Sequence, residues 1–116
     1  MDKPTVRLES GATGTKRKEA ATSSDQNVKL AIRLIEAVNE ALVAASKTTL
    51  KGVLACEDNE LVSMDFKGHP ASSIVDLDCT MTSGPRLVKV LSWYDNEAGF
   101  SHRMVDMALF MASKGL

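Results

Sequence analysis

Apolar residues recur at spacings of three and four over residues 27–46, the period of one face of an α-helix. The stripe consists of Ala31, Ile35, Val38, Leu42 and Ala45. Just before it, Ser23 is followed three residues later by Gln26, the arrangement of a capping box at a helix start. We therefore predict a helix over about 27–46, whose shallow apolar face of β-branched residues and Ala lies flat on a sheet.

The first 26 residues show a different pattern. Residues 4–9 alternate, with Val6 and Leu8 on one side, which predicts a short half-buried strand. Residues 10–26 are rich in Gly, Ser and Thr, contain no apolar residue larger than Ala and show no periodicity. This composition predicts a mobile loop or an insertion.

Four short apolar runs follow the helix and predict strands. They cover residues 50–56, 61–66, 73–82 and 86–94, and turn residues separate them. The last run is apolar on both faces, which is typical of a central strand that is covered twice.

The final stretch returns to helical spacing. Phe100, Met104, either Met107 or Ala108, and Met111 fall on one stripe, and Lys114 with Gly115 marks the end. We predict a C-terminal helix over about residues 97–113. The order of strand, helix, strands and helix indicates an α+β fold with a mostly antiparallel sheet.

Composition narrows the class of protein. The chain has 116 residues, a formal net charge of −1 and 44% apolar residues, values of an ordinary soluble single domain. No apolar run approaches the ~18 residues of a membrane span, and the near-neutral charge argues against nucleic-acid binding. With two cysteines and no signal peptide, we expect a cytoplasmic protein.

The aromatic residues are distributed unevenly. All five Phe, Trp and Tyr residues lie at position 66 or later. Large packing anchors must therefore come from the second half of the chain, and a surface that binds a partner is expected.

One interpretation of Cys79-Thr80, which is followed by a turn at 83–85, is a nucleophile beside an oxyanion-binding turn. A cysteine nucleophile needs a base within hydrogen-bond reach, however, and neither His69 nor His102 argues for that pairing. The favoured interpretation is a strand cysteine. No Cys or His lies at metal-ligand spacing, so we predict no metal site and assign no catalytic residue.

Residues 92–100 form the densest polar and aromatic cluster, where a strand gives way to a helix. An asparagine there offers both a donor and an acceptor to a carboxamide ligand. The alternative is that Asp95 or Asn96 only caps the helix, and the residues alone favour the cap.

Several segments resemble glyceraldehyde-3-phosphate dehydrogenases. Ser-Trp-Tyr-Asp-Asn-Glu at 92–97 resembles the C-terminal signature of that family. Further similar segments, in the same order, are 50–54, 61–66, 72–76, 88–90 and 111–114. The resemblance covers about residues 46–114, and residues 10–26 match poorly.

The resemblance implies that residues 27–116 are a partial C-terminal catalytic domain, with 1–26 as a short strand plus a divergent loop. In the family a Rossmann domain precedes this region. The family reaction is the phosphorylating oxidation of an aldehyde, in which a cysteine thiolate with a histidine base forms a thiohemiacetal that passes hydride to NAD. This chain contains neither Gly-x-Gly-x-x-Gly nor the family's Ser-Cys-Thr-Thr-Asn-Cys segment. The resemblance therefore implies a fragment or truncated paralogue that is inactive alone.

The same resemblance implies cofactor-binding roles for three residues. Asn96 matches the asparagine that hydrogen-bonds the nicotinamide carboxamide of NAD, Glu97 keeps a carboxylate of that corner, and Phe100 replaces a tyrosine. Ala98 and His102 also depart from the family pattern, which puts normal cofactor binding in question.

Two other interpretations stay open. One is a non-catalytic interaction module, because in the family this sheet contributes to tetramer contacts and the last helix docks on the nucleotide domain. Its expected partners are a Rossmann domain or full-length subunits, in a homo- or hetero-oligomer, and not nucleic acid or membrane. The other is a piece of an erythrose-4-phosphate dehydrogenase.

Overall fold

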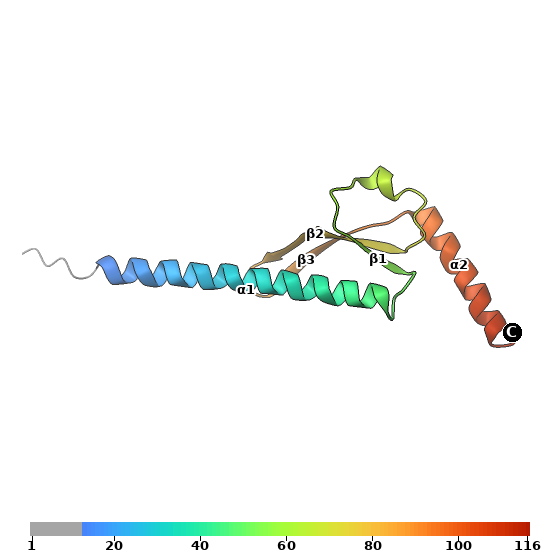
Figure 1. Ribbon diagram of the computed structural model, residues 1–116, viewed down its shortest axis with the longest axis horizontal. Helices are drawn as coiled ribbons and strands as arrows, with labels where there is room; N and C mark the ends of the chain where they lie inside the picture. The colour runs from blue at the N-terminus through green and yellow to red at the C-terminus, as the bar shows by residue number, and fades with distance from the viewer. Residues whose placement is uncertain (1–12) are drawn as a thin grey trace, which may run out of the picture.

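The computed structural model describes the backbone of residues 13–116 and the side chains from residue 23 onward. Figure 1 shows one long helix along a small sheet and another helix that leaves the sheet at its end and points away from it. In chain order the elements are α1 (Thr13–Lys47), β1 (Leu54–Glu57), a 3₁₀ helix η1 (Ser63–Phe66), β2 (Ser73–Ser83), β3 (Leu87–Trp93) and α2 (Asn96–Ser113).

The sheet has three strands in the order β1-β2-β3. β1 runs parallel to β2, with Leu54 opposite Ser73, and the longer β2–β3 pair is antiparallel, with Ile74 opposite Trp93. The predicted α+β class is confirmed, with a sheet that is mixed rather than wholly antiparallel.

The prediction that the strand at 86–94 is central was wrong. Among the described strands, β2 is central and β3 forms an edge. Leu87 is 60% exposed and Val90 41% exposed. An apolar run on both faces indicates that a strand can be covered twice, but no element of the described chain covers β3 in that way.

α1 packs on the sheet as its periodicity predicted. All five residues of the predicted stripe, from Ala31 to Ala45, are half-buried. Asn39 adds a specific contact, because its Nδ2 donates to the backbone oxygen of Leu77 in β2 at 2.9 Å. Figure 1 shows α1 along one side of the sheet, with its N-terminal part extending beyond it.

The start of α1 corrects the expected loop at 10–26. The helix already begins at Thr13, so Ser23 and Gln26 lie inside it and form no capping box at its start. Residues 16–21 are Lys, Arg, Lys, Glu, Ala and Ala, all strong helix formers that outweigh the cost of Gly14. The predicted strand at 4–9 lies outside the described residues.

The predicted strand at 61–66 is also corrected, because it contains η1 instead. The Oδ2 atom of Asp65 accepts a hydrogen bond from the backbone nitrogen of Val62 at 2.8 Å, which tightens the turn. The turn directs Phe66 into the core, where it is only 4% exposed. Competition from a local side-chain bond explains why apolar alternation did not give a strand here.

The first predicted strand, at 50–56, starts later than expected. The nitrogens of Val53 and Leu54 both donate to the backbone oxygen of Leu50, and Gly52 has φ +82°, so this stretch is a turn. β1 begins only at Leu54.

The core lies between the sheet and η1. It consists of Phe66, Ala71 and Ile74, with Ala55, Leu61 and Trp93 packed against it. The rings of Phe66 and Trp93 stack at a centroid distance of 5.7 Å. The indole Nε1 of Trp93 also donates to Asp76 at 3.2 Å, so the end of β3 is held on two sides.

α2 forms over almost the predicted range, but its apolar stripe is not covered. Phe100 is 67% exposed, Met104 59% and Met107 58%. All residues from 104 to 116 are exposed. Within the described part of the chain, no helix combines the length and the apolar character that a membrane crossing needs.

Candidate functional site

The junction between β3 and α2 is fixed by the carboxylate of Asp95. Its Oδ1 accepts from the nitrogen of Ala98 at 3.0 Å, which is the N-cap bond of α2. Its Oδ2 accepts from the nitrogen of Gly68 at 2.8 Å, 27 residues away in sequence. These two N–H donors, Gly68 first, lower the pKa of the Asp95 carboxyl below its ordinary value. The cap predicted for this junction is confirmed at Asp95.

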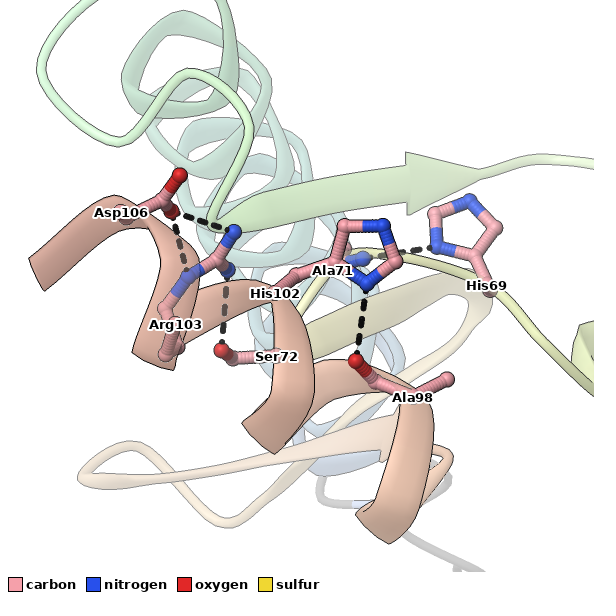
Figure 2. A network of polar contacts seen from close by, with 7 residues as sticks. All are labelled: His69, Ala71, Ser72, Ala98, His102, Arg103 and Asp106. Atoms are coloured by element: carbon pink, nitrogen blue, oxygen red, sulfur yellow. Dashed lines mark hydrogen bonds and ion pairs between the residues drawn. The ribbon is translucent and has the colours of Figure 1, made fainter. Parts of the chain in front are cut away.

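The first turns of α2 lie against the segment that leads into β2. A Cβ atom on the buried Gly99 would come within 3.2 Å of the backbone oxygen of Ala71, so glycine permits this close approach. One turn later, Nη1 of Arg103 donates to Oγ of Ser72 at 3.1 Å. Asp106 holds the other side of the same guanidinium, at 2.8 Å from Nε (Figure 2).

The two histidines of this region serve the backbone. Nδ1 of His69 accepts from the nitrogen of Ala71 at 3.1 Å, and Nδ1 of His102 lies 2.9 Å from the backbone oxygen of Ala98 (Figure 2). The described residues contain no group of three or more His, Cys, Asp or Glu that could hold a metal ion. The observed contacts of His69 and His102 are therefore structural.

Asn96 is exposed and stands between two small hollows. The first, about 220 Å³, is lined by Ser72, Tyr94, Asp95, Asn96, Gly99, Phe100 and Arg103. The second, about 250 Å³, is lined by Ser63, Met64, Phe66, Lys67, Tyr94, Asp95, Asn96 and Glu97. Of the three predicted cofactor residues, Asn96 borders both hollows, whereas Phe100 borders only the first and Glu97 only the second.

Sequence reasoning missed several residues of this corner. Arg103 lies three positions after Phe100, so helical spacing alone places the two on the same side of α2. By contrast, no local pattern shows that the backbone of Gly68 meets Asp95 from 27 residues away. The same is true of Ser72 and Lys67, which come from other segments.

Cys79 lies in an irregular part of β2, where the register with β3 shifts between Asp76 and Met81. Its backbone nitrogen donates to Oδ1 of Asp76 at 3.1 Å. A hydrogen bond to the Asp76 carboxylate and desolvation raise the pKa of the Cys79 thiol. A raised pKa reduces the thiolate fraction, so the surroundings disfavour a nucleophile here.

A larger hollow than the two around Asn96 lies elsewhere, between α1 and the β2–β3 turn. It measures about 410 Å³ and is lined by Asn27, Val28, Leu30, Ala31, Leu34, Thr82, Gly84 and Pro85. No lining side chain titrates, so this hollow offers no acid, base or charged partner for chemistry. The smaller hollows around Asn96 have the polar groups that orient a ligand.

Comparison with known proteins identifies the family. Residues 21–96 match the family model described as glyceraldehyde 3-phosphate dehydrogenase, C-terminal domain. The chain belongs to the glyceraldehyde-3-phosphate dehydrogenase family. The match begins upstream of the resemblance seen at about 46–114 and takes in part of α1, all three strands and the first residue of α2.

Curated relatives agree with this assignment. The glyceraldehyde-3-phosphate dehydrogenase of Geobacillus stearothermophilus is 52% identical over 82 residues, 71% of this chain and 24% of that protein. Glyceraldehyde-3-phosphate dehydrogenase 1 of Bacillus cereus is 51% identical over 82 residues, 71% of this chain and 25% of that protein. The chain thus spans about a quarter of the length of these dehydrogenases.

Proposed function

We propose that this chain is a C-terminal catalytic-domain piece of a glyceraldehyde-3-phosphate dehydrogenase and that Asn96 contacts the nicotinamide carboxamide of NAD. We place the dehydrogenase-like part at residues 27–116, preceded by residues 1–26; the family match begins at residue 21, and α1 runs unbroken across that boundary. On this proposal the protein works in the cytoplasm, in the glycolytic oxidation of an aldehyde phosphate.

The observation that carries the proposal is the setting of Asn96. Its side-chain amide is exposed between the two hollows, and no hydrogen bond within the described residues occupies it. An amide offers one acceptor and two donors, which match the donor and acceptor of a carboxamide. The free amide therefore fits the nicotinamide end of the cofactor.

The size of the hollows limits what this chain binds alone. At about 220 and 250 Å³, each is smaller than the roughly 300–1,000 Å³ of an ordinary ligand site. Each has room for a ring and its carboxamide but not for a whole dinucleotide. NAD, when bound, supplies the hydride acceptor of the reaction. Asn96, which borders both hollows, then orients the ring, with Phe100 lining the first hollow and Glu97 the second.

NAD titration of the 116-residue chain tests this role. Asn96→Ala removes both hydrogen-bonding groups, so saturation-transfer signals of the nicotinamide protons should disappear. Asn59→Ala is the matched control, because Asn59 is an exposed asparagine that lines neither hollow. Equal nicotinamide signals in wild type and Asn96→Ala would contradict the proposed contact.

We propose further that these 116 residues do not catalyse the reaction alone. The sequence contains no match to the family's nucleophile segment, and the surroundings of Cys79 disfavour a thiolate. An assay of the pure chain with NAD, an aldehyde phosphate and inorganic phosphate should show no reduction of NAD. Turnover that co-purifies with the chain and is lost in Cys79→Ser would overturn this point.

The exposed apolar surface of α2 favours a second candidate function, a non-catalytic interaction module. The exposed residues are Phe100, Met104, Val105, Met107, Leu109, Phe110 and Met111. Clusters of exposed large apolar residues are uncommon on soluble monomers and mark interaction sites. The proposed partner is a full-length dehydrogenase subunit or a second copy of this chain.

Size-exclusion chromatography tests the second candidate. The chain should self-associate or co-elute with the full-length Geobacillus stearothermophilus dehydrogenase, and Met107→Glu should reduce that association. A monomer that fails to co-elute with the full-length protein would rule out this function.

A further inference from the structure

Asp95 has two bonding partners that come from different parts of the chain. One oxygen caps α2 through Ala98, and the other binds the turn at Gly68. The carboxylate thus connects the helix that carries Asn96 to the segment just after η1. It also lines both hollows that Asn96 borders.

The turn at Gly68 is built to make this contact. Gly68 has φ +80°, a conformation that side-chain-bearing residues rarely adopt, and its N–H faces the carboxylate. Phe66, two residues earlier, is buried in the core and stacked on Trp93. Because both ends of this short path are anchored, the Asp95–Gly68 bond fixes the separation between α2 and the η1 side of the second hollow.

We infer that Asp95 is a positioning residue, which holds the amide of Asn96 at the mouth of the two hollows by connecting the start of α2 to Gly68. This inference rests on the proposed contact between Asn96 and nicotinamide. Asp95 itself touches no cofactor in this scheme. It acts through the place that it gives to Asn96, the next residue in the chain.

The charged groups around Asp95 do not offer a substitute for the bond. Lys67 and Glu97 line the second hollow and Arg103 the first. Lys67 and Arg103 carry no acceptor for the Gly68 N–H, and Glu97 makes no hydrogen bond to it in the structure. Loss of the Asp95 carboxylate therefore leaves the Gly68 N–H without its partner and frees the turn to move relative to α2.

Two variants separate this role from ordinary helix capping. Asp95→Ser and Asp95→Asn both retain a side-chain oxygen that caps α2. Serine is too short to reach Gly68 as well, and asparagine has one oxygen where aspartate has two. Both variants should fold with α2 intact, whereas Asp95→Ala loses both bonds. Asp78→Asn is the matched control, because Asp78 is an exposed aspartate of β2 that lines neither hollow.

The readouts are the NMR signals of the Gly68 backbone amide and the Asn96 side-chain amide, together with NAD affinity. In wild type the Gly68 signal should titrate at acid pH as Asp95 is protonated. In Asp95→Ser that titration should vanish, and the chemical shifts of the two Asn96 side-chain protons should change because the residue moves relative to the rings of Tyr94 and Phe100, which line the first hollow with it. NAD binding should weaken about tenfold, the factor that corresponds to ~1.4 kcal/mol. Asp78→Asn should leave all three readouts unchanged.

The inference fails if Asp95→Ser leaves the Asn96 side-chain signals and the NAD affinity at their wild-type values. A wild-type chain that binds no NAD would instead contradict the proposed cofactor contact. In that case the NMR signals of Asn96 and Gly68 still test whether Asp95 is a positioning residue, because they are measured without ligand.

Discussion

The two helices carry the same kind of apolar stripe, but only one of the stripes is covered. On α1 the five stripe residues Ala31, Ile35, Val38, Leu42 and Ala45 lie half-buried against the sheet. On α2 the stripe residues Phe100, Met104, Met107 and Met111 are 46–67% exposed. Periodicity of three and four predicts a helix in both places, yet it does not show what lies against the apolar face.

The difference lies in how each helix is attached. α1 runs along β1 and β2 and is bonded in its middle through Asn39. α2 is held at its start, by Asp95, Gly99 and Arg103, and points away from the sheet beyond that (Figure 1). Because α2 is fixed at one end only, the apolar side chains along its remaining length stay exposed.

The largest effect on the unfolding free energy is expected from a charge placed in the covered apolar stripe of α1. Ile35→Glu places a charge against the sheet and should lower the free energy of unfolding by about 2 kcal/mol, measured by urea denaturation. Ala37→Glu, on the exposed side of α1, is the control and should change it by less than about 0.5 kcal/mol. Equal effects of the two variants would mean that α1 does not pack on the sheet in solution.

A smaller effect is expected at the attachment of α2. Gly99→Val brings side-chain atoms against the backbone oxygen of Ala71 and should cost about 1–2 kcal/mol in unfolding free energy. Ala108→Val is the matched control on the exposed side of α2, with a cost of about 0.7 kcal/mol or less from helix propensity. If Gly99→Val is no worse than its control, α2 is not docked at this point.

Acid should weaken the same attachment. The folded pKa of Asp95 is lowered, so its contribution to stability is present at neutral pH and lost as pH falls below about 3.9 and through the lowered folded pKa. The difference in urea midpoint between wild type and Asp95→Asn should therefore shrink toward zero on acidification. If the midpoint difference between wild type and Asp95→Asn is the same at pH 6 and pH 2, the ionised carboxylate of Asp95 does not contribute to stability.

The smallest effect on stability is expected on the uncovered stripe. Met107 is 58% exposed, so Met107→Glu should change the unfolding free energy by less than about 0.5 kcal/mol. The same variant should reduce association in size-exclusion chromatography if α2 binds a partner. A large loss of monomer stability would show that α2 folds back onto its own chain.

Local patterns in the sequence predicted both helices, the β2 and β3 strands and the cap at Asp95. These patterns failed where a competing local preference or a contact with a distant segment determines the structure of a segment. The Asp65 side chain converts the expected strand at 61–66 into η1, and strong helix formers extend α1 through the expected loop. The edge position of β3 depends on which strands are present and not on its own residues.

The candidate site was predictable only in part. Asn96 could be chosen only through the resemblance of residues 92–97 to the family signature, because the residues alone favoured a helix cap. The residues that position it come from segments around Gly68 and Ala71, so their roles depend on tertiary contacts. The separation of Glu97 and Phe100 into different hollows likewise follows from the direction in which α2 leaves the sheet.

The stack between Phe66 and Trp93 gives the protein a built-in optical probe. Trp93 is the single tryptophan, with its ring against Phe66 and its indole nitrogen bonded to Asp76. It directly precedes Tyr94, which lines both hollows beside Asn96. Its fluorescence therefore reports on the corner where β3 meets α2, so folding and ligand occupancy there can be followed without an added label.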